Sequence, residues 1–290
     1  MKVLVTGASG SVGAPLVRRL SEQDVMTRAV VRRPESAAAL EEQRLPGVEV
    51  ASTDLANEAA ARHLLDGIDA VFLLTANAGN QLAQEQSVIR AATEAGVRRV
   101  VKLSVGGVSP DAPLALARVH YAAEQNLAAS GLPRTVLRPA FFMDNLLQFI
   151  GWIEPSGRLE LPLGDGAMPM IDARDIADVA AVELHDSSTH DRELVLTGPE
   201  DLTMTQALGR IAEVVGRPLS YVDGNRTDFL RRYVADGNSP EYAEDIATLY
   251  DAILRAGYGA GTTDGVRKVT GQAPRTITDF AQAHRAAFTG

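Results

Sequence analysis

The chain has 290 residues, of which 46% are hydrophobic and 22% are charged. This length and composition suit one large α/β domain with a smaller lobe. The chain has no cysteine, which excludes a disulfide framework and thiolate chemistry. Its formal net charge of −9 disfavours general nucleic-acid binding, because that binding depends on cations that neutralise phosphates. We therefore expect no nucleic-acid partner.

The sequence also bears on location. It has no apolar run of about 18 residues, the length that a membrane span needs. A glycine-rich turn begins at residue 7, which leaves no room for a signal peptide. We expect a cytoplasmic protein that binds no membrane.

The amino terminus combines an apolar strand, residues 2–6, with a turn of spacing Gly-x-x-Gly-x-x-Gly. Gly7 allows a tight bend, Gly10 lets the backbone approach a pyrophosphate, and Gly13 lets the next helix lie close to the sheet. The helix that follows directs unpaired N–H groups and a positive dipole end at the turn. We expect the turn to bind a dinucleotide through Gly7, Ser9, Gly10, Ser11, Val12 and Gly13.

Strands and helices alternate through the next part of the chain. Strands are predicted at residues 27–31, 48–51, 70–74, 99–103 and 134–137, and helices at 35–45, 57–65, 80–95 and 114–130. Asn57 is expected to cap its helix, while Gly96 and Gly131 end theirs. This order implies right-handed crossovers and a Rossmann-type, doubly wound parallel sheet. Ligands of such a sheet gather at the carboxyl ends of its strands.

The alternation loosens after residue 139. Residues 152–170 contain three prolines, which indicates a loop-rich insertion. A helix is predicted to open at residues 172–177, and one more strand at 193–197. The rest is predicted to be mostly helical, with a capping box at Thr203 and Gln206, a cap at Ser239, and a last helix over 279–288 that Thr278 caps.

These elements predict two parts. Residues 1–150 form the dinucleotide-binding Rossmann domain, to which residues 171–198 return. Residues 151–170 and 199–290 form a smaller, mostly helical lobe that binds substrate. Helices that flank such a sheet often form a homodimer interface, but the sequence does not distinguish a dimer from a monomer.

The second strand indicates which dinucleotide binds. It ends at Arg32 and Arg33, where a site for NAD would carry a carboxylate for the ribose hydroxyl. Because a guanidinium suits a 2′-phosphate, we expect NADPH, with Arg32 as the first choice of ligand and Arg33 as the second. The alternative is a solvated basic pair. Further along the same edge we expect cofactor contacts from Asp54, Leu55, Leu74, Thr75 and Ala76, although Asp54 is equally suited to cap a helix.

The glycine spacing resembles that of extended and atypical short-chain dehydrogenases. Standard members of that superfamily carry Tyr-x-x-x-Lys after the fifth strand, where the tyrosine donates a proton. Alignment to the extended pattern through Glu124 and Leu127 places Leu116 at the tyrosine and His120 at the lysine. The usual dyad is therefore absent.

Five segments together resemble the NmrA-like branch of the atypical enzymes: residues 3–13, 30–33, 100–106, 120–127 and 135–146. That branch includes quinone oxidoreductases of the second type, triphenylmethane reductases, and regulators that bind dinucleotide without turnover. The resemblance implies nicotinamide contacts from Pro139, Ala140, Phe141 and Phe142. It further places Lys102, Ser104 and His120 near the ribose or the substrate, and Asn145 at the pocket wall.

The candidate catalytic groups are His120, Lys102 and Tyr121. An imidazole can donate a proton near neutral pH, although a structural histidine is an equal alternative for His120. Lys102 is as well suited to extend from a strand end, Ser104 to cap a turn, and Tyr121 to pack in a core. The histidines show no metal-ligand spacing, so we expect no metal.

The missing tyrosine points to a class of acceptor. A carbonyl substrate needs an acid, whereas a quinone or another conjugated electrophile accepts hydride with little help. The residues expected to line an apolar pocket for such a small molecule are Phe142, Asn145, Phe149 and Trp152, although aromatic stripes of this kind also form plain cores. The leading hypothesis is an NADPH-dependent reductase of quinone-like compounds. Two alternatives stay open: a dinucleotide-sensing regulator, and a carbonyl or imine reductase that uses His120 as its proton donor.

Overall fold

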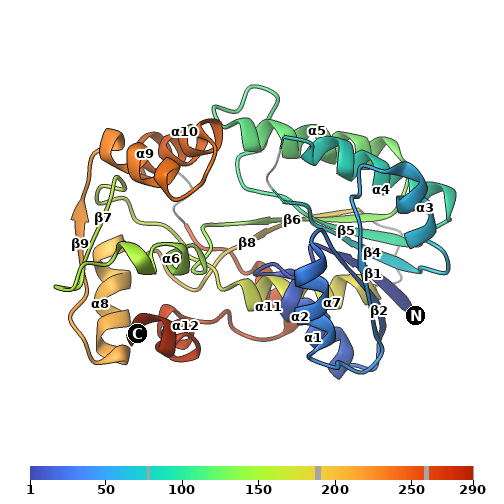
Figure 1. Ribbon diagram of the computed structural model, residues 1–290, viewed down its shortest axis with the longest axis horizontal. Coiled ribbons are helices and arrows are strands. Elements are labelled where there is room, and N and C mark those ends of the chain that lie inside the picture. The colour runs from blue at the N-terminus through green and yellow to red at the C-terminus, as the bar shows by residue number, and fades with distance from the viewer. Residues whose placement is uncertain (77–78, 187–190, 258–260, 290) are drawn as a thin grey trace. The chain divides into compact units, whose positions relative to one another are not determined.

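The computed structural model describes residues 1–76, 79–186, 191–257 and 261–289 (Figure 1). Its contacts divide the chain into two compact units. The first unit consists of Met1–Pro139, Ala173–Val195 and Lys268–Gly271. The second unit consists of Ala140–Asp172, Leu196–Arg267 and Gln272–Gly290.

The first unit is built on a seven-stranded sheet of order β3-β2-β1-β4-β5-β6-β8. Its strands are β1 (Lys2–Thr6), β2 (Met26–Val31), β3 (Val48–Ser52), β4 (Ala70–Leu73), β5 (Arg99–Leu103), β6 (Arg134–Pro139) and β8 (Arg192–Leu196). Neighbours from β3 through β6 pair in parallel. The strand order reverses between β1 and β4, which confirms the expected doubly wound, Rossmann-type sheet.

Helices cover both faces of this sheet. They are α1 (Gly13–Glu22), α2 (Pro34–Glu41), α3 (Glu58–Leu64), α4 (Gln81–Glu94), α5 (Ala115–Ala129) and α7 (Ala173–His185). Helix α4 packs between α3 and α5 on one face, and α1 packs against α7 on the other (Figure 1). Asn57 caps α3 as expected, since its side chain accepts from the N–H of Ala60 at 3.2 Å. Helix α2 ends at Glu41, four residues before the expected 45, because Arg44 adopts a φ of +49° and Pro46 disfavours helix in the residue before it.

The glycine turn after β1 has little spare volume. Gly7 has a φ of +64°, a conformation that favours glycine. A Cβ atom on Gly13 would lie 2.1 Å from the carbonyl oxygen of Gly7. The Thr6 hydroxyl donates to Leu74 O at 2.7 Å and accepts from Leu74 N at 2.8 Å, which ties the end of β1 to the end of β4. The turn is therefore shaped by the packing of the chain itself.

The second unit contains two short parallel strands and most of the carboxyl-terminal helices. The strands are β7 (Arg158–Leu161) and β9 (Ser220–Asp223). The helical elements are α6 (Asn145–Gln148), η1 (Ile150–Trp152), α8 (Met204–Val215), α9 (Arg226–Ala235), α10 (Pro240–Thr248), the π-helix η2 (Leu249–Leu254), α12 (Ile277–Ala283) and α13 (Arg285–Thr289). A further helix, α11 (Gly265–Thr270), begins in this unit and ends in the first.

The insertion at 152–170 is loop-rich as expected, but it also contains strand β7, which pairs with β9; each strand has four residues, too few for a clear periodicity. One expectation for this part was wrong: the last helical region is capped by Thr276, not Thr278, and it breaks at His284. Thr276 and Asp279 form a capping box, a spacing that the sequence already carried.

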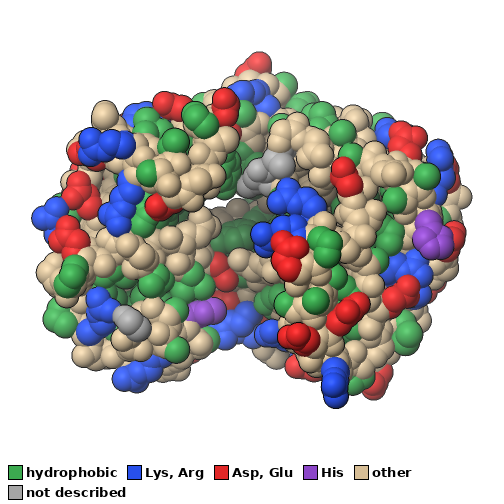
Figure 2. Space-filling view, in the orientation of Figure 1, with side chains coloured by type: hydrophobic (Ala, Val, Ile, Leu, Met, Phe, Trp, Pro, Cys, Tyr) green, Lys and Arg blue, Asp and Glu red, His purple; other side chains and the backbone are tan. Residues whose placement is uncertain are grey.

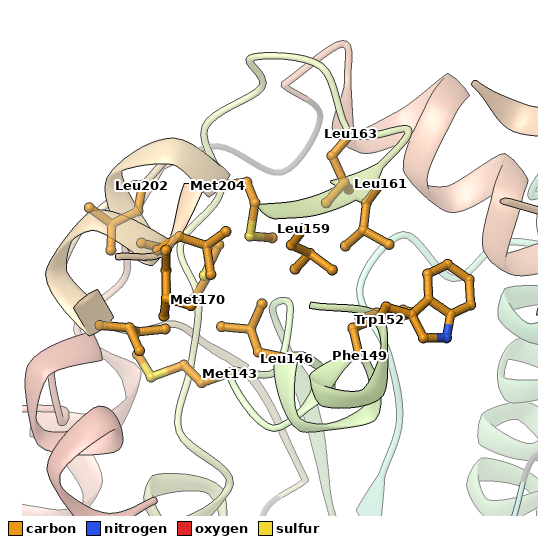
Figure 3. Close-up of a cluster of buried hydrophobic side chains, with 14 of the residues drawn as sticks. Met143, Leu146, Phe149, Trp152, Leu159, Leu161, Leu163, Met170, Leu202 and Met204 are labelled. Carbon is orange, nitrogen blue, oxygen red and sulfur yellow. The ribbon is translucent and has the colours of Figure 1, made fainter. Parts of the chain in front are cut away.

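The core of the second unit is aromatic and methionine-rich (Figure 3). Phe149 packs edge-on against Trp152 with ring centroids 5.1 Å apart. Phe229 and Tyr233 stack at 5.1 Å beside them, and burial raises the pKa of Tyr250 in the same cluster. These rings are large and mutually constrained, so they fix the packing of the unit.

No helix of the described residues is long and apolar enough to cross a membrane. Acidic and basic side chains are intermixed on the face shown in Figure 2. The described residues include exposed ion pairs such as Arg62 Nε with Glu94 Oε2, 2.7 Å apart.

We expect Gly13→Ala to lower the free energy of unfolding by about 3 kcal/mol, because the new methyl group would overlap the Gly7 carbonyl. Gly10→Ala is the matched control: its Cβ would lie 3.3 Å from the same oxygen, and we expect a cost below about 1 kcal/mol. Urea denaturation measures both. Equal losses in the two variants would contradict the tight packing at Gly13.

Candidate active site

The carboxyl ends of β4 and β5 carry a buried polar cluster. It consists of five side chains with at most 6% exposure: Thr75, Gln81, Glu85, Lys102 and His120. Thr75 follows β4, Lys102 belongs to β5, Gln81 and Glu85 lie on α4, and His120 lies on α5. Two strands and two helices thus place polar groups at the edge where a doubly wound sheet binds ligands.

Glu85 and Lys102 form the centre of this cluster, and neither side chain is exposed. Lys102 Nζ donates to Glu85 Oε2 at 2.5 Å and to Leu103 O at 3.3 Å, and it lies 3.3 Å from His120 Nδ1. These contacts match the three N–H donors of an ammonium group. Glu85 Oε1 accepts in addition from Thr75 at 2.9 Å and from Gln81 at 3.3 Å. A ligand would have to displace one of these partners to reach the ammonium group of Lys102.

His120 lies between two hydrogen-bond donors. Its Nδ1 faces Lys102 Nζ, and its Nε2 lies 3.3 Å from Nε2 of Gln81. A neutral ring keeps one N–H group and can accept a hydrogen bond from one of these two donors, whereas a protonated ring can accept from neither. Burial, and then the charge of Lys102, lower the pKa of His120 from 6.5 to about 3. The ring is therefore uncharged near neutral pH, which favours the structural alternative for His120 over a proton donor.

Ser104, with 1% exposure, belongs to a second group of hydrogen-bonded polar side chains. Its hydroxyl donates to Glu124 Oε1 at 2.5 Å. Arg138 donates two hydrogen bonds to the carboxylate of Glu124, at 3.2 and 2.6 Å. It donates a third to Glu193 at 2.8 Å. Since its only proton is directed at Glu124, Ser104 has acceptor capacity left for a ligand and no donor.

The glycine turn suits an anion. Its residues Ser9, Gly10 and Ser11 are exposed. Among the described residues, the backbone N–H groups of Ser11, Val12 and Gly13 find no acceptor, whereas Gly10 N donates to Gly7 O at 3.0 Å. Three free N–H groups at the start of α1 form the arrangement that binds phosphate at helix termini.

The two arginines after β2 are both exposed but differ in their partners. Arg33 Nε lies 3.4 Å from Glu35 Oε1. The guanidinium of Arg32 has no hydrogen bond or ion pair within the described part of the chain, and the main-chain oxygen of Arg32 accepts from Ser52 at 3.4 Å. The side chain of Arg32 is therefore free to meet a phosphate.

The remaining candidates along this edge differ in burial. Asp54 accepts from Ala56 N at 3.0 Å, so it closes a turn, while Asn57 caps the helix. Leu55 is buried, Leu74 is half-buried, and Ala76 is exposed. Tyr121 is half-buried on α5, next to His120.

The expected nicotinamide and substrate residues straddle the division of the chain. Pro139 is buried and ends β6 in the first unit, while Ala140, Phe141 and Phe142 are half-buried and belong to the second unit. Asn145 is half-buried at the start of α6. Phe149 and Trp152 have 2% and 5% exposure and pack inside the aromatic cluster of the second unit, which favours the alternative that they are core residues.

Sequence reasoning missed Gln81, Glu85 and Arg138, and it used Glu124 only for alignment. Gln81 and Glu85 lie one turn apart on α4, and that spacing was the available signal. No cluster of potential metal ligands occurs among the residues that the structure describes.

We expect His120 to make stability depend on pH. Its pKa in the fold lies below the ordinary 6.5, so below pH 6.5 the unfolded chain takes up a proton that the folded chain does not, and stability falls as pH falls. Between pH 7 and pH 5 the wild-type protein should lose about 2 kcal/mol more than His120→Gln. Urea denaturation at both pH values measures this. The control His63→Gln removes an exposed histidine and should retain the wild-type loss; a wild-type loss in His120→Gln as well would contradict the uncharged ring.

Comparison with known proteins places this geometry in a family. Residues 1–274 match the NmrA-like family. The chain is 34% identical to an NAD(P)H azoreductase of Xenophilus azovorans, over 99% of both chains, and 35% identical to a (4-alkanoyl-5-oxo-2,5-dihydrofuran-3-yl)methyl phosphate reductase of Streptomyces griseus, also over 99% of both. The crystal structure of NADPH-dependent quinone oxidoreductase QOR2 of Escherichia coli, complexed with NADPH, superposes with a TM-score of 0.83 at 25% identity, over 97% of this chain and 99% of that one. The chain belongs to the NmrA-like family.

Proposed function

We propose that this protein is an NADPH-dependent reductase that transfers hydride to a small, conjugated electrophile such as a quinone-like compound. At the coarser level it is an NAD(P)H-dependent oxidoreductase, in keeping with its reductase relatives. The observation that carries the finer proposal is the state of the buried polar groups at the ends of β4 and β5.

Those groups are poorly suited to donate a proton. His120 is uncharged near neutral pH, Ser104 directs its hydroxyl proton at Glu124, and Lys102 has a partner for each of its N–H groups. Reduction of a simple ketone develops an alkoxide that needs an acid, whereas an extended conjugated acceptor spreads the added negative charge over its own framework. This edge of the sheet therefore favours conjugated acceptors.

The relatives point to the same chemistry. An azo group, a quinone, and a dihydrofuran ring that carries oxo and alkanoyl substituents are all electron-poor conjugated systems, and they appear in the names of the related reductases. When bound, the dihydronicotinamide supplies the hydride. The protein then has to hold the coenzyme, orient the acceptor and exclude water.

The chain has the parts that would hold this coenzyme. The free N–H groups of Ser11, Val12 and Gly13 would bind the pyrophosphate. Gly10 has no side chain and so leaves room for it. Arg32 would bind the 2′-phosphate, which is why we propose NADPH over NADH. Ser104 would accept a hydrogen bond from the ribose or the carboxamide, and Phe142 and Asn145 are candidates for substrate contact.

The test of the function is loss of NADPH absorbance with a panel of quinones, azo dyes and doubly activated alkenes, against unconjugated ketones as the control set. We expect turnover within the conjugated set and none with the ketones. Tight coenzyme binding with no turnover of any acceptor would contradict the proposal and favour a dinucleotide sensor. Reduction of the ketones would favour a carbonyl reductase.

We expect Arg32→Ala to raise the KM for NADPH by about tenfold to a hundredfold while leaving the KM for NADH nearly unchanged, because a charge-assisted contact to the 2′-phosphate is lost. Arg33→Ala is the matched control, and its smaller effect is expected because Glu35 already pairs with Arg33. Steady-state kinetics with both coenzymes measure the ratio. An unchanged ratio in Arg32→Ala would count against NADPH selection by this residue.

A further inference from the structure

Glu85 and Lys102 form an ion pair that is fully buried in the first unit. A buried ion pair is a weak source of stability, because the loss of hydration of two charges offsets most of their attraction. Removing one partner alone leaves an uncompensated charge. Stabilisation of the fold therefore does not explain this ion pair well. Its position in the sheet is more informative about its role.

The pair lies in the second half of the sheet. The strand order reverses between β1 and β4, and β4 and β5 belong to the half beyond that point. In doubly wound sheets a dinucleotide spans both halves. The glycine turn after β1 and Arg32 after β2 occupy the first half, which assigns the nicotinamide end to the half that contains Lys102.

The charge of that end changes during the reaction. A reduced nicotinamide ring is uncharged, and the oxidised ring carries a positive charge. An uncompensated ammonium group nearby would therefore disfavour the oxidised coenzyme and weaken the bound reduced coenzyme as a hydride donor. Of the partners described for Lys102, namely Glu85, Leu103 O and His120, Glu85 is the one with a negative charge.

We propose that Glu85 is a positioning residue that neutralises Lys102, so that the carboxyl edge of β4 and β5 presents no net charge to the nicotinamide ring as hydride transfer makes that ring positive. This inference rests on the proposed function. Thr75 and Gln81, which also bond to Glu85, are neutral, and His120 is uncharged. Helix α5 carries the carboxylate of Glu124, which is already paired with Arg138.

The test is the ratio of the dissociation constants of NADP⁺ and NADPH, measured by calorimetry from pH 6 to pH 9. The phosphates common to both coenzymes cancel in this ratio. In the wild-type protein the ratio should stay flat. In Glu85→Gln it should rise on the order of tenfold, because the cation then acts alone on the oxidised ring.

Glu183→Gln is the matched control. Glu183 is also buried, at 1% exposure, but it lies on α7 against the opposite face of the sheet, where it accepts from Thr135 at 2.8 Å and Arg192 at 2.9 Å. Its substitution should leave the ratio at the wild-type value. A purely structural role of Glu85 would weaken the binding of both coenzymes together and leave the ratio unchanged.

A second variant keeps the proposal testable if Glu85→Gln does not fold. Lys102→Met leaves the carboxylate without its partner, so the ratio should move in the opposite direction and fall on the order of tenfold. A ratio equal to that of the wild type in either folded variant, across the whole pH range, would overturn the proposal.

The outcome is separable from that of the proposed function. The ratio of the two dissociation constants is measured without an acceptor. A protein that binds both coenzymes but reduces no acceptor would contradict the proposed reductase activity, and the ratio would still test the role of Glu85. A protein that reduces quinones and shows a wild-type ratio in Glu85→Gln would contradict only the role of Glu85. Absence of binding by either coenzyme would overturn both.

Discussion

The buried ion pair of Glu85 and Lys102 constrains everything around the candidate active site. Because both side chains are shielded from water, each depends on the other, and together they hold helix α4 to the end of β5. Thr75, Gln81 and His120 take their hydrogen-bonding roles from this pair. The ends of β4 and β5 thus carry a set of polar groups whose protons are already assigned.

That assignment shapes the chemistry open to the protein. His120 is uncharged near neutral pH, and Ser104 directs its hydroxyl proton at Glu124, so neither side chain is suited to donate a proton. Burial and the charge of Lys102 keep the His120 ring uncharged, and Glu124 accepts the hydroxyl proton of Ser104. Under the proposed function, groups behind the ligand-facing surface would therefore limit proton donation at this site.

The sequence revealed the features that depend on neighbours along the chain. The glycine turn, the cap at Asn57 and the alternation of strands and helices are local, and the structure contains them. Strands β7 and β9 were missed because they are short and their partners lie about 60 residues apart. Glu85 was missed because a glutamate between two glutamines resembles a solvated helix face, and only contact with Lys102, 17 residues away, buries it. His120 was identified, but its loss of charge follows from burial, which the sequence does not display.

The tight packing of the glycine turn has a consequence for how a coenzyme is exchanged. The carbonyl of Gly7 occupies the space beside Gly13, and Thr6 fastens the strand end to its neighbour, so the cradle exists before any ligand arrives. A preorganised cradle spends little binding energy on ordering its own loop. Under the proposed function, a coenzyme would enter and leave this turn without refolding of the loop.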